Sequence, residues 1–373
     1  MLRGEKPMSG PSIYPVILAG GASSRLWPAS GRERPKWDLR LFGKAGTDGQ
    51  PQSLLEGAWE RARGVAPAAN CFVVAGSAQA ELIRRSLPEL PQSNLLIEPE
   101  PRDTSGAVAY AAAAILRQAD GSANEAVMFV LPGDHVISQL DKFKRCALTA
   151  AQAAVQLQAL MTFGIVARSP ATAYGYIHRG QAVALADLPA GAPTAYEVQQ
   201  FREKPDLATA ERYVASGEYF WNGGIFIWTL AALMQEFQAQ LPEHARMIEA
   251  LRMTPGEATA RTHFPKLKKI SIDFGIMEHA KKVATVTADF DWDDIGSWSA
   301  VAAHLDSSSG NATGPGTQIL PLDAKGNLVF APGKRVALIG VEGLAVVQHG
   351  DEILICRLDR DQDVKQVSAK WSK

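Results

Sequence analysis

Between residues 13 and 306, short apolar runs alternate with longer alanine-rich stretches in which apolar residues recur every few positions. Short apolar runs are typical of buried strands, and the longer periodic stretches are typical of amphipathic helices. Alternating strands and helices form βαβ units, which assemble into a mostly parallel sheet with helices on both faces. The pattern predicts a doubly wound α/β fold, with strands at 16–19, 71–75, 95–97 and 126–131 and helices at 78–86, 106–118 and 142–160.

The pattern changes after Asp306. Residues 307–316 are rich in Ser and Gly, which indicates a linker, and residues 317–373 carry short β-rich runs between glycines without a convincing helix. The segments 338–343 and 344–349 hint at a six-residue repeat, which is weak evidence for a β-helix. We therefore expect a flexible N-terminal segment at 1–12, an α/β domain at 13–306, a linker at 307–316 and a small β-rich domain at 317–373.

Composition excludes some classes of partner. The 373-residue chain has a formal net charge of −1, so its charge gives no reason to expect nucleic acid or an anionic membrane as a partner. No apolar run approaches the roughly 20 residues that span a bilayer, and the N-terminus lacks the apolar core of a signal peptide. We expect a cytoplasmic protein. Cys71, Cys146 and Cys356 lie far apart and are interpreted as buried reduced thiols.

A glycine pair follows the first predicted strand. Gly20 and Gly21 let the backbone approach a ligand closely, and the N–H groups of such a turn, with Arg25 beside them, can hold a triphosphate. The spacing matches neither a P-loop, which ends in Gly-Lys-Ser/Thr, nor the G-x-G-x-x-G of a dinucleotide fold. Gly-Gly after a strand is by itself more often an ordinary tight turn, but the Arg25, Trp27-Pro28 and Pro35-Lys36 that follow favour phosphate binding.

Two acidic segments are candidates for a metal site. Asp134 follows Gly133 at the end of a predicted strand, where ligands of open α/β sheets bind and where an acid could hold hydrated Mg²⁺ against phosphates. A lone Asp after a strand is more often a helix N-cap, and the neighbouring His135 need not bind a metal. The run Asp291-Trp-Asp-Asp294 offers a second acid, although spacing alone cannot pair it with Asp134.

The stretch Leu18-Ala-Gly-Gly-Ala-Ser-Ser-Arg25-Leu-Trp-Pro28 with Pro35-Lys36 resembles the signature of sugar-1-phosphate nucleotidyltransferases, in particular bacterial mannose-1-phosphate guanylyltransferases. Their pattern is L-A-G-G-x-G-T/S-R-L-W-P followed by P-K-Q-F, so this chain departs from it at 22–24 and at Trp37-Asp38. The segment around Asp134 resembles P-A-D-H, whose Asp binds the metal. The segment 291–298 resembles W-S-D-V-G-S-W, which makes Asp294 the second metal ligand and Asp293 the variable position.

The resemblance also implies a sugar site. Phe201-Arg-Glu203-Lys204-Pro-Asp206 is similar to F-x-E-K-P-D, so Lys204 would bind the sugar phosphate and Glu203 would accept hydrogen bonds from sugar hydroxyls. Taken alone, this motif would be an exposed Glu-Lys pair before a proline turn. Gly175 and Asn222 lie in segments similar to G-Y-G-Y and W-N-S-G-M-F. Gly223 replaces the Ser of the second pattern and removes one hydroxyl.

The segment that starts at Glu98 is similar to E-P-x-x-R-D/N-T-A, which lies near the guanine base in the family. A carboxylate of Glu98 or Asp103 could accept from guanine N1–H and the 2-amino group, which would reject adenine. Thr104 is as well explained as the N-cap of the helix predicted from Gly106. The nucleotide site implied by the resemblance comprises Leu18, Ala19, Gly20, Gly21, Glu98, Arg102, Asp103, Thr104 and Gly133. The segment 271–278 also resembles S-I-D-Y-A-V-M-E, with Phe274 in place of Tyr.

The resemblance implies transfer of GMP from GTP to α-D-mannose 1-phosphate, giving GDP-mannose and pyrophosphate, by Mg²⁺-assisted in-line attack. Arg25 and Lys36 would hold the triphosphate, Lys204 the attacking phosphate, and Asp134 with Asp294 the Mg²⁺. It also implies a Rossmann-like fold, a β-helix-like C-terminal domain that supports a homodimer, and one activity without an isomerase domain. Two alternatives stay open: the same chemistry on another sugar 1-phosphate or nucleotide, and a non-catalytic nucleotide-sugar sensor.

Overall fold

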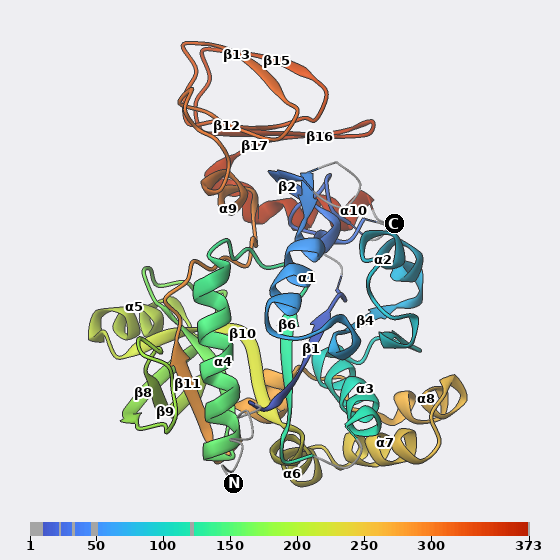
Figure 1. Ribbon diagram of the computed structural model, residues 1–373. Coiled ribbons are helices and arrows are strands. Elements are labelled where there is room, and N and C mark those ends of the chain that lie inside the picture. The colour runs from blue at the N-terminus through green and yellow to red at the C-terminus, as the bar shows by residue number, and fades with distance from the viewer. Residues whose placement is uncertain (1–9, 22–23, 32–33, 46–50, 120–122, 372–373) are drawn as a thin grey trace, which may run out of the picture.

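The computed structural model describes residues 10–21, 24–31, 34–45, 51–119 and 123–371. Its centre is a nine-stranded mixed sheet with helices on both faces, as Figure 1 shows. Most of its strands run in the same direction, and β10 and β9 run against their neighbours. The strand order is β5 (Leu95–Glu98), β4 (Phe72–Gly76), β1 (Ser12–Leu18), β6 (Ala126–Pro132), β10 (Tyr219–Thr229), β7 (Leu160–Val166), β11 (Val283–Thr287), β9 (Ala195–Arg202) and β8 (Tyr176–Val183).

Strand β1 lies between β4 and β6 and pairs with both in parallel. Leu18 is opposite Pro132 of β6, and Gly76 at the end of β4 is opposite Glu98 of β5. The carboxyl ends of four parallel strands therefore meet at one edge of the sheet. The glycine pair, the Asp134 segment and Glu98 all leave the sheet at that edge, where ligands of such sheets bind.

The helices bury the apolar faces of the sheet in two cores. One core packs α1 and α4 with the sheet, and the other packs α3, α6 and α7 against the opposite face. A capping box between Ser53 and Glu56 starts α1. The helices are α1 (Leu54–Val65), α2 (Ala80–Ser86), α3 (Asp103–Gln118), α4 (Leu140–Leu157), α5 (Leu207–Ser216), α6 (Leu230–Gln240), α7 (Pro242–Met253), α8 (Glu257–His263), α9 (Trp298–Ala303) and α10 (Val364–Trp371).

These elements confirm the predicted doubly wound sheet, with differences at the ends of elements. Helix α3 begins at Asp103, three residues before the predicted 106, and the helix predicted to reach residue 160 ends at Leu157, after which Leu160 starts β7. Ser12 already pairs with Ala126 in the sheet, whereas we had placed it in the N-terminal segment, of which residues 1–9 lie outside the described residues. No helix in the described ranges is long and apolar enough to cross a membrane.

The C-terminal domain is a short parallel β coil. Strands β12 (Ala312–Thr313), β14 (Leu328–Phe330) and β16 (Leu344–His349) form one wall, and β13 (Gln318–Leu322) with β15 (Arg335–Ile339) forms the other. Ala312 pairs with Leu328 and Gln318 pairs with Arg335, so one turn takes 16 or 17 residues. The suggested six-residue repeat is therefore wrong. Helix α10, which we had not expected, follows the hairpin between β16 and β17 (Glu352–Arg357).

Asparagine side chains connect successive turns of the coil. Asn311 Oδ1 accepts from both the backbone N–H and the Nδ2 of Asn327, and Asn327 Oδ1 accepts from the N–H of Leu344. Asn311 and Ala312 are buried, so part of the segment expected to be a linker lies inside the first turn. Two of these contacts satisfy the backbone N–H groups of Asn327 and Leu344, and the third pairs the two asparagine side chains.

The coil and the α/β domain share a hydrophobic core. It contains Leu26 and Trp27 of the signature stretch, Trp298 of α9, and Leu328 and Phe330 of β14. A small hairpin of β2 (Arg40–Ala45) and β3 (Pro51–Ser53) lies on the same side of the sheet, as Figure 1 shows. Leu26 and Trp27 of the signature stretch are thus packed between the sheet and the coil.

Candidate active site

A hollow opens at the edge where β1 and β6 end, and it brings together residues that are far apart in the sequence. It includes Arg25, Lys36, Asp134 and Asp294, which the sequence predicts to bind phosphates and a metal. Its complete lining among the described residues is Gly20, Gly21, Ser24, Arg25, Lys36, Trp37, Asp134, Asp294 and Gly296.

The glycine pair forms an open floor. A Cβ at Gly20 or Gly21 would meet no atom within 4 Å, and Gly21 has φ +89°, which disfavours other residues. The carbonyl of Ala19 accepts from the Trp37 indole N–H at 3.0 Å, which fixes the entrance of the turn. Gly133 instead packs against the end of β1. Its N–H donates to Leu18 O at 3.0 Å, and a Cβ at Gly133 would lie 3.1 Å from that oxygen. The backbone of β1, rather than a ligand, therefore explains this glycine.

Lys36 lies between the two predicted metal ligands. It belongs to a short 3₁₀ turn, Lys36–Asp38, and its Nζ donates to Asp134 Oδ2 at 2.8 Å and to the backbone oxygen of Asp294. Burial by itself would raise the pKa of Asp134, but the neighbouring Lys36 ammonium lowers that pKa below its usual value. Asp134 is therefore ionised at neutral pH.

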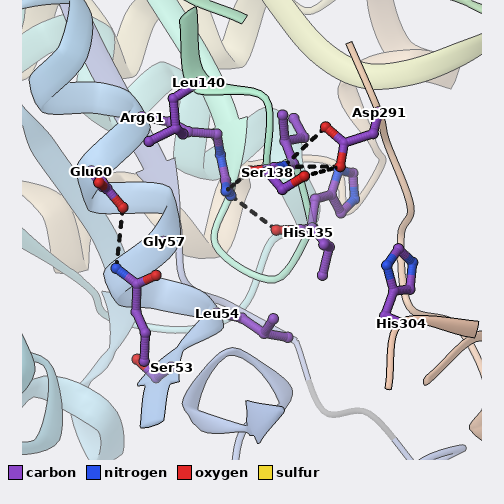
Figure 2. A pocket seen from close by; sticks show the side chains of 13 residues that line it. Ser53, Leu54, Gly57, Glu60, Arg61, His135, Ser138, Leu140, Asp291 and His304 are labelled. Carbon is purple, nitrogen blue, oxygen red and sulfur yellow. Dashed lines mark hydrogen bonds between the residues drawn. The ribbon is translucent and has the colours of Figure 1, made fainter. Parts of the chain in front are cut away.

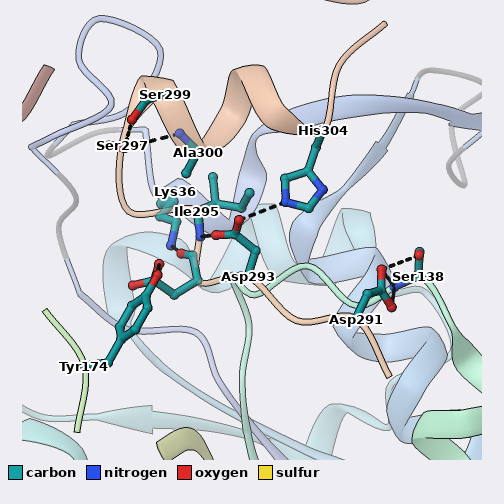
Figure 3. Close-up of polar contacts among 11 residues, drawn as sticks. Lys36, Ser138, Tyr174, Asp291, Asp293, Ile295, Ser297, Ser299, Ala300 and His304 are labelled. Atoms are coloured by element: carbon teal, nitrogen blue, oxygen red, sulfur yellow. Dashed lines mark hydrogen bonds and ion pairs between the residues drawn. The ribbon is translucent and has the colours of Figure 1, made fainter. Parts of the chain in front are cut away.

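The Asp294 carboxylate faces the same hollow. Its Oδ1 accepts from the Tyr174 hydroxyl at 3.0 Å, and Figure 3 shows this tyrosine pointing toward the loop that carries Asp293 and Asp294. A Cβ at Gly296 would lie 3.3 Å from Asp294 Oδ1 and 3.5 Å from the Arg25 guanidinium, so the glycine leaves room for both groups. The Asp293 carboxylate, in contrast, is hydrogen-bonded to the Ile295 N–H and to His304.

These residues fit a hydrated Mg²⁺. No group of three or more His, Cys, Asp or Glu side chains gathers as a metal cage among the described residues. Two carboxylates facing one hollow are nevertheless the donor set that Mg²⁺ takes when phosphate oxygens and water complete its coordination. Asp134 and Asp294 supply that pair.

His135 supports the site from behind. Its Nδ1 accepts from the Trp292 indole at 3.1 Å, its ring packs edge-on to the indole, and burial lowers its pKa to about 4. The imidazole is neutral at physiological pH, and its Nε2 lies 4.0 Å from Asp134 Oδ1. It packs beside Asp134 without a hydrogen bond to its carboxylate at this distance.

The predicted sugar-site residues form a second cluster. Gly175 adjoins both Glu203 and Asn222, because a Cβ at Gly175 would overlap Glu203 Oε2 and would lie 3.2 Å from Asn222 Cβ. Glu203 Oε1 pairs with Lys204 Nζ at 2.7 Å, and Oε2 is buried without a hydrogen-bond partner in the described part of the chain. The Lys204 side chain is 57% exposed, so its ammonium group is accessible to a ligand. The backbone at Lys204 has φ +44°.

Asp273 joins this cluster, although no role was predicted for it from the sequence. Its Oδ1 accepts from Asn222 Nδ2 at 3.0 Å, while Asn222 Oδ1 accepts from Thr162 at 3.0 Å. Burial and the nearby Glu203 charge raise the pKa of Asp273 to about 7. The resemblance of 271–278 to S-I-D-Y-A-V-M-E could have pointed to Asp273, but only the fold shows that Asp273 lies beside Asn222.

The Gly223 substitution lies on the sheet side of this cluster. A Cβ here would lie 3.4 Å from Ile165 and 3.5 Å from the carbonyl oxygen of Phe163, both on β7. A serine side chain at this position would start toward the sheet, so its absence leaves the cluster around Glu203 intact.

The predicted base-binding residues lie at the end of β5 and the start of α3. Burial, followed by the charge of Asp103, raises the pKa of Glu98 to about 7, and Glu98 Oε1 is buried without a partner among the described residues. Asp103 has φ +63° and accepts from Thr104 N–H at 2.7 Å. The Thr104 hydroxyl accepts from Ile272 N–H at 2.8 Å, so Thr104 ties α3 to the 270–272 loop and does not cap the helix.

Arg102 is turned toward the protein surface nearby. Its Nε donates to Glu100 at 2.9 Å and its NH2 group donates to the Pro265 carbonyl oxygen at 3.0 Å. Arg102 thus holds the loop before α3. Among the described residues, its guanidinium makes no hydrogen bond to Glu98 or to the Gly20-Gly21 turn.

The glycine turn after β1, with cations and paired acids around it, is the arrangement that the resemblance to nucleotidyltransferases implies. The chain belongs to the nucleotidyl transferase family, whose model matches residues 14–307. Residues 317–370 match the MannoseP isomerase/GMP-like beta-helix domain.

Named relatives narrow the similarity. The chain is 34% identical over 374 residues to the mannose-1-phosphate guanylyltransferase of Escherichia coli K12, covering 96% of this chain and 73% of the relative. It is 34% identical over 366 residues to the xanthan biosynthesis protein XanB of Xanthomonas campestris, covering 95% and 72%. A solved structure from Thermus thermophilus, described as a mannose-1-phosphate geranyltransferase, is 32% identical with a TM-score of 0.84 and covers 97% of this chain and all of that one.

Proposed function

We propose that this protein transfers GMP from GTP to α-D-mannose 1-phosphate, producing GDP-mannose and pyrophosphate. The observation that carries the proposal is the convergence of Arg25, Lys36, Asp134 and Asp294 around the Gly20-Gly21 turn. A binding protein for a nucleotide sugar has no need of this full set of charges. The similarity to enzymes named mannose-1-phosphate guanylyltransferase supports the choice of substrates.

The reaction needs no general base. An oxygen of the sugar phosphate is already ionised at neutral pH, and it attacks the α-phosphorus of GTP. A new oxygen–phosphorus bond forms as the bond from the α-phosphorus to the β-phosphate oxygen breaks, and pyrophosphate leaves with the electron pair. Catalysis then consists of bringing two anions together and stabilising the charge that moves to the leaving group.

The chain supplies the groups for this task. The Gly20-Gly21 backbone and Arg25 would bind the triphosphate, and Lys36 would neutralise the developing pyrophosphate charge. Lys204 would hold the attacking phosphate, and Glu203 and Asn222 the sugar hydroxyls. Asp134 and Asp294 would hold Mg²⁺, which when bound neutralises phosphate charge and acts as a Lewis acid.

Guanine recognition is proposed for Glu98. Its buried carboxylate oxygen without a partner is suited to accept hydrogen bonds from guanine N1–H and the 2-amino group. Asp103 already accepts from its neighbour's N–H, which makes it the weaker candidate.

The test is pyrophosphate release by the purified protein with Mg²⁺, crossing the four common nucleoside triphosphates with mannose, glucose and heptose 1-phosphates. Release with GTP and mannose 1-phosphate alone is the expected result. Release with a different pair would keep the mechanism and replace the substrates. GDP-mannose binding without release by any pair would identify a sensor and overturn the proposal.

We further propose that the protein acts in the cytoplasm as a homodimer. The coil carries exposed apolar side chains that a second copy would cover, namely Leu320, Leu322, Ile339, Ile353 and Ile355. Light scattering should give twice the chain mass, and Leu320→Glu with Ile339→Glu should shift it to the monomer mass.

A further inference from the structure

A second hollow lies behind the Asp134 loop, between α1 and the chain around Asp291, as Figure 2 shows. The buried Arg61 of α1 donates to the carbonyl oxygens of His135 at 2.9 Å and Ile137 at 3.5 Å. Asp291 accepts from the N–H groups of Ser138 at 3.0 Å and Gln139 at 2.9 Å. These side chains hydrogen-bond to the backbone of the Asp134 loop. The residues that line this hollow therefore hold that loop in place from the side away from the active site.

The two acidic loops are joined to each other by their backbones. Val136 N–H donates to Asp293 O at 2.8 Å, and Asp293 N–H donates to Val136 O at 3.1 Å. Asp134 and Asp294 are therefore each one or two residues from a shared pair of hydrogen bonds. This bridge and Lys36, which bonds to both residues, together hold the two acids near each other.

The bridge fixes the backbone at Asp293 but not the direction in which Asp294 leaves it. The Asp293 carboxylate adds that constraint: Oδ1 accepts from Ile295 N–H at 2.7 Å, and Oδ2 lies 2.9 Å from His304 Nε2. Figure 3 shows Asp293 between Ile295 and His304. Ile295 has φ +46°, an unfavourable conformation for a β-branched residue, and its side chain is fully buried.

His304 is anchored by the elements around it. It directly follows α9, whose first turn is capped by Ser297 and whose Trp298 indole donates to Trp27 O at 3.1 Å. Ser299 N–H donates to Asp361 in the C-terminal domain at 2.7 Å. The imidazole therefore presents a fixed point to Asp293.

We propose that Asp293 and His304 form a positioning pair that holds the Asp294 carboxylate toward the metal. The proposal rests on the metal role given to Asp294 under the proposed function. It assigns a task to the position that varies in the resembled motif, where the family has Ser and this chain has Asp. A serine hydroxyl could still accept from Ile295 N–H, but it would be too short to reach His304.

The proposal predicts how substitutions at Asp293 and His304 change the Mg²⁺ requirement. Asp293→Ser and His304→Ala should each raise the Mg²⁺ concentration for half-maximal rate by about tenfold, the usual scale for outer-shell partners of a metal ligand. The KM for mannose 1-phosphate should not change. The double variant should be no worse than either single variant, because both remove the same contact. Asp293→Asn should stay within about threefold of wild type, since its amide can bond to both partners.

A second readout does not depend on turnover. Mn²⁺ is titrated into the protein with GTP and without sugar phosphate, and free Mn²⁺ is followed by electron paramagnetic resonance. Asp293→Ser and His304→Ala should weaken Mn²⁺ binding by the same factor as they raise the Mg²⁺ requirement. Glu342→Gln, in the exposed pair with Lys325, and the exposed His279→Ala are matched controls that should leave both readouts unchanged.

The outcomes separate this proposal from the proposed function. Wild-type Mg²⁺ dependence and Mn²⁺ affinity in both folded single variants would overturn the pair, as would effects that multiply in the double variant. Thermal unfolding of each variant identifies any that fail to fold, for which His304→Asn replaces the test: its shorter amide falls short of Asp293 Oδ2, so the same tenfold effect is expected. If the wild type turned over no substrate pair, the proposed function would fail, while the Mn²⁺ titration would still decide the role of the pair.

Discussion

The phosphate side and the recognition side of the site are built differently. On the phosphate side, Lys36, Asp134 and Asp294 are linked by hydrogen bonds to one another or to neighbouring side chains. On the recognition side, Glu203 Oε2 and Glu98 Oε1 are buried without a hydrogen-bond partner in the described part of the chain. The phosphate side is thus already hydrogen-bonded within the protein, whereas the recognition side holds acceptors that no described residue satisfies.

The difference follows from what each side must bind. A charged cluster that is already paired is preorganised for anions and costs little reorganisation when they bind. A buried carboxylate oxygen without a donor costs free energy, which sugar hydroxyls or base N–H groups would recover. Selectivity should therefore depend on the recognition side, and turnover on the phosphate side.

The largest expected effect is on the phosphate side. Lys36→Ala removes the cation between the two acids and should lower kcat on the order of 100-fold or more, since charge stabilisation of the leaving group is lost. Steady-state pyrophosphate release measures it. Lys325→Ala, in an exposed pair on the coil, is the control. Turnover of Lys36→Ala near the wild-type value would show that the phosphate side is assigned wrongly.

The next effect is on sugar recognition. Gly175→Ala places a Cβ where the Glu203 carboxylate lies, so that carboxylate must move. We expect the KM for mannose 1-phosphate to rise by roughly 10- to 100-fold, the cost of misplacing a buried charged hydrogen-bond partner. The KM for GTP should not change. Gly64→Ala, in an open position on α1, is the matched control. Equal changes in both KM values would contradict the separation of the two sides.

A smaller effect concerns pH and the base. Glu98 must be ionised to accept twice from guanine, and its pKa is raised to about 7. The kcat/KM for GTP should therefore fall by about tenfold as the pH is lowered from about 8 to about 6, because the ionised fraction falls by that factor.

Glu98→Gln should remove that pH dependence, since an amide does not titrate in this range, and should reduce discrimination between GTP and ATP. Glu100→Gln, two residues away and on the surface pair with Arg102, is the control. A pH profile unchanged in Glu98→Gln would assign the titration to another group.

The smallest effect is expected at Gly223. A Cβ has room beside Ile165 and Phe163, so Gly223→Ser should change kcat and both KM values by no more than about threefold. Kinetics with GTP and mannose 1-phosphate measure it. A large fall in the KM for the sugar phosphate would show that the hydroxyl reaches the recognition side after all.

Local pattern was sufficient for much of the sheet and for part of the phosphate side. Strands near 71–75, 95–97 and 126–131 were predicted because their apolar runs are short and bounded, and parallel strands bring their carboxyl ends to one edge. Gly20, Gly21 and Asp134 follow such strands, so their proximity could be inferred. Asp294 was paired with Asp134 only through the family resemblance, because about 160 residues separate them.

Contacts distant in the sequence could not be predicted. The hydrogen bond from Tyr174 to Asp294 joins the segment before β8 to the loop before α9, and the one from Asn222 to Asp273 joins β10 to the 270–278 segment. The coil repeat was missed because its signal is carried by glycines and asparagines 16 or 17 residues apart, not by apolar alternation. Thr104 looked like a helix cap because its partner, Ile272, lies far along the chain.

The corners of the coil carry a consequence for the length of this domain. Gly310, Gly326 and Gly343 have positive φ at one corner, and Gly316 and Gly333 have it at another. Each turn therefore begins and ends in the same backbone conformation, and a copy of residues 327–343 inserted after Gly343 would continue the stack. Each added turn would lengthen the domain by one strand spacing of about 4.8 Å. It would also carry Glu352 and Trp371 away from Trp27, which both contact, so the number of turns is tied to the fit against the signature stretch.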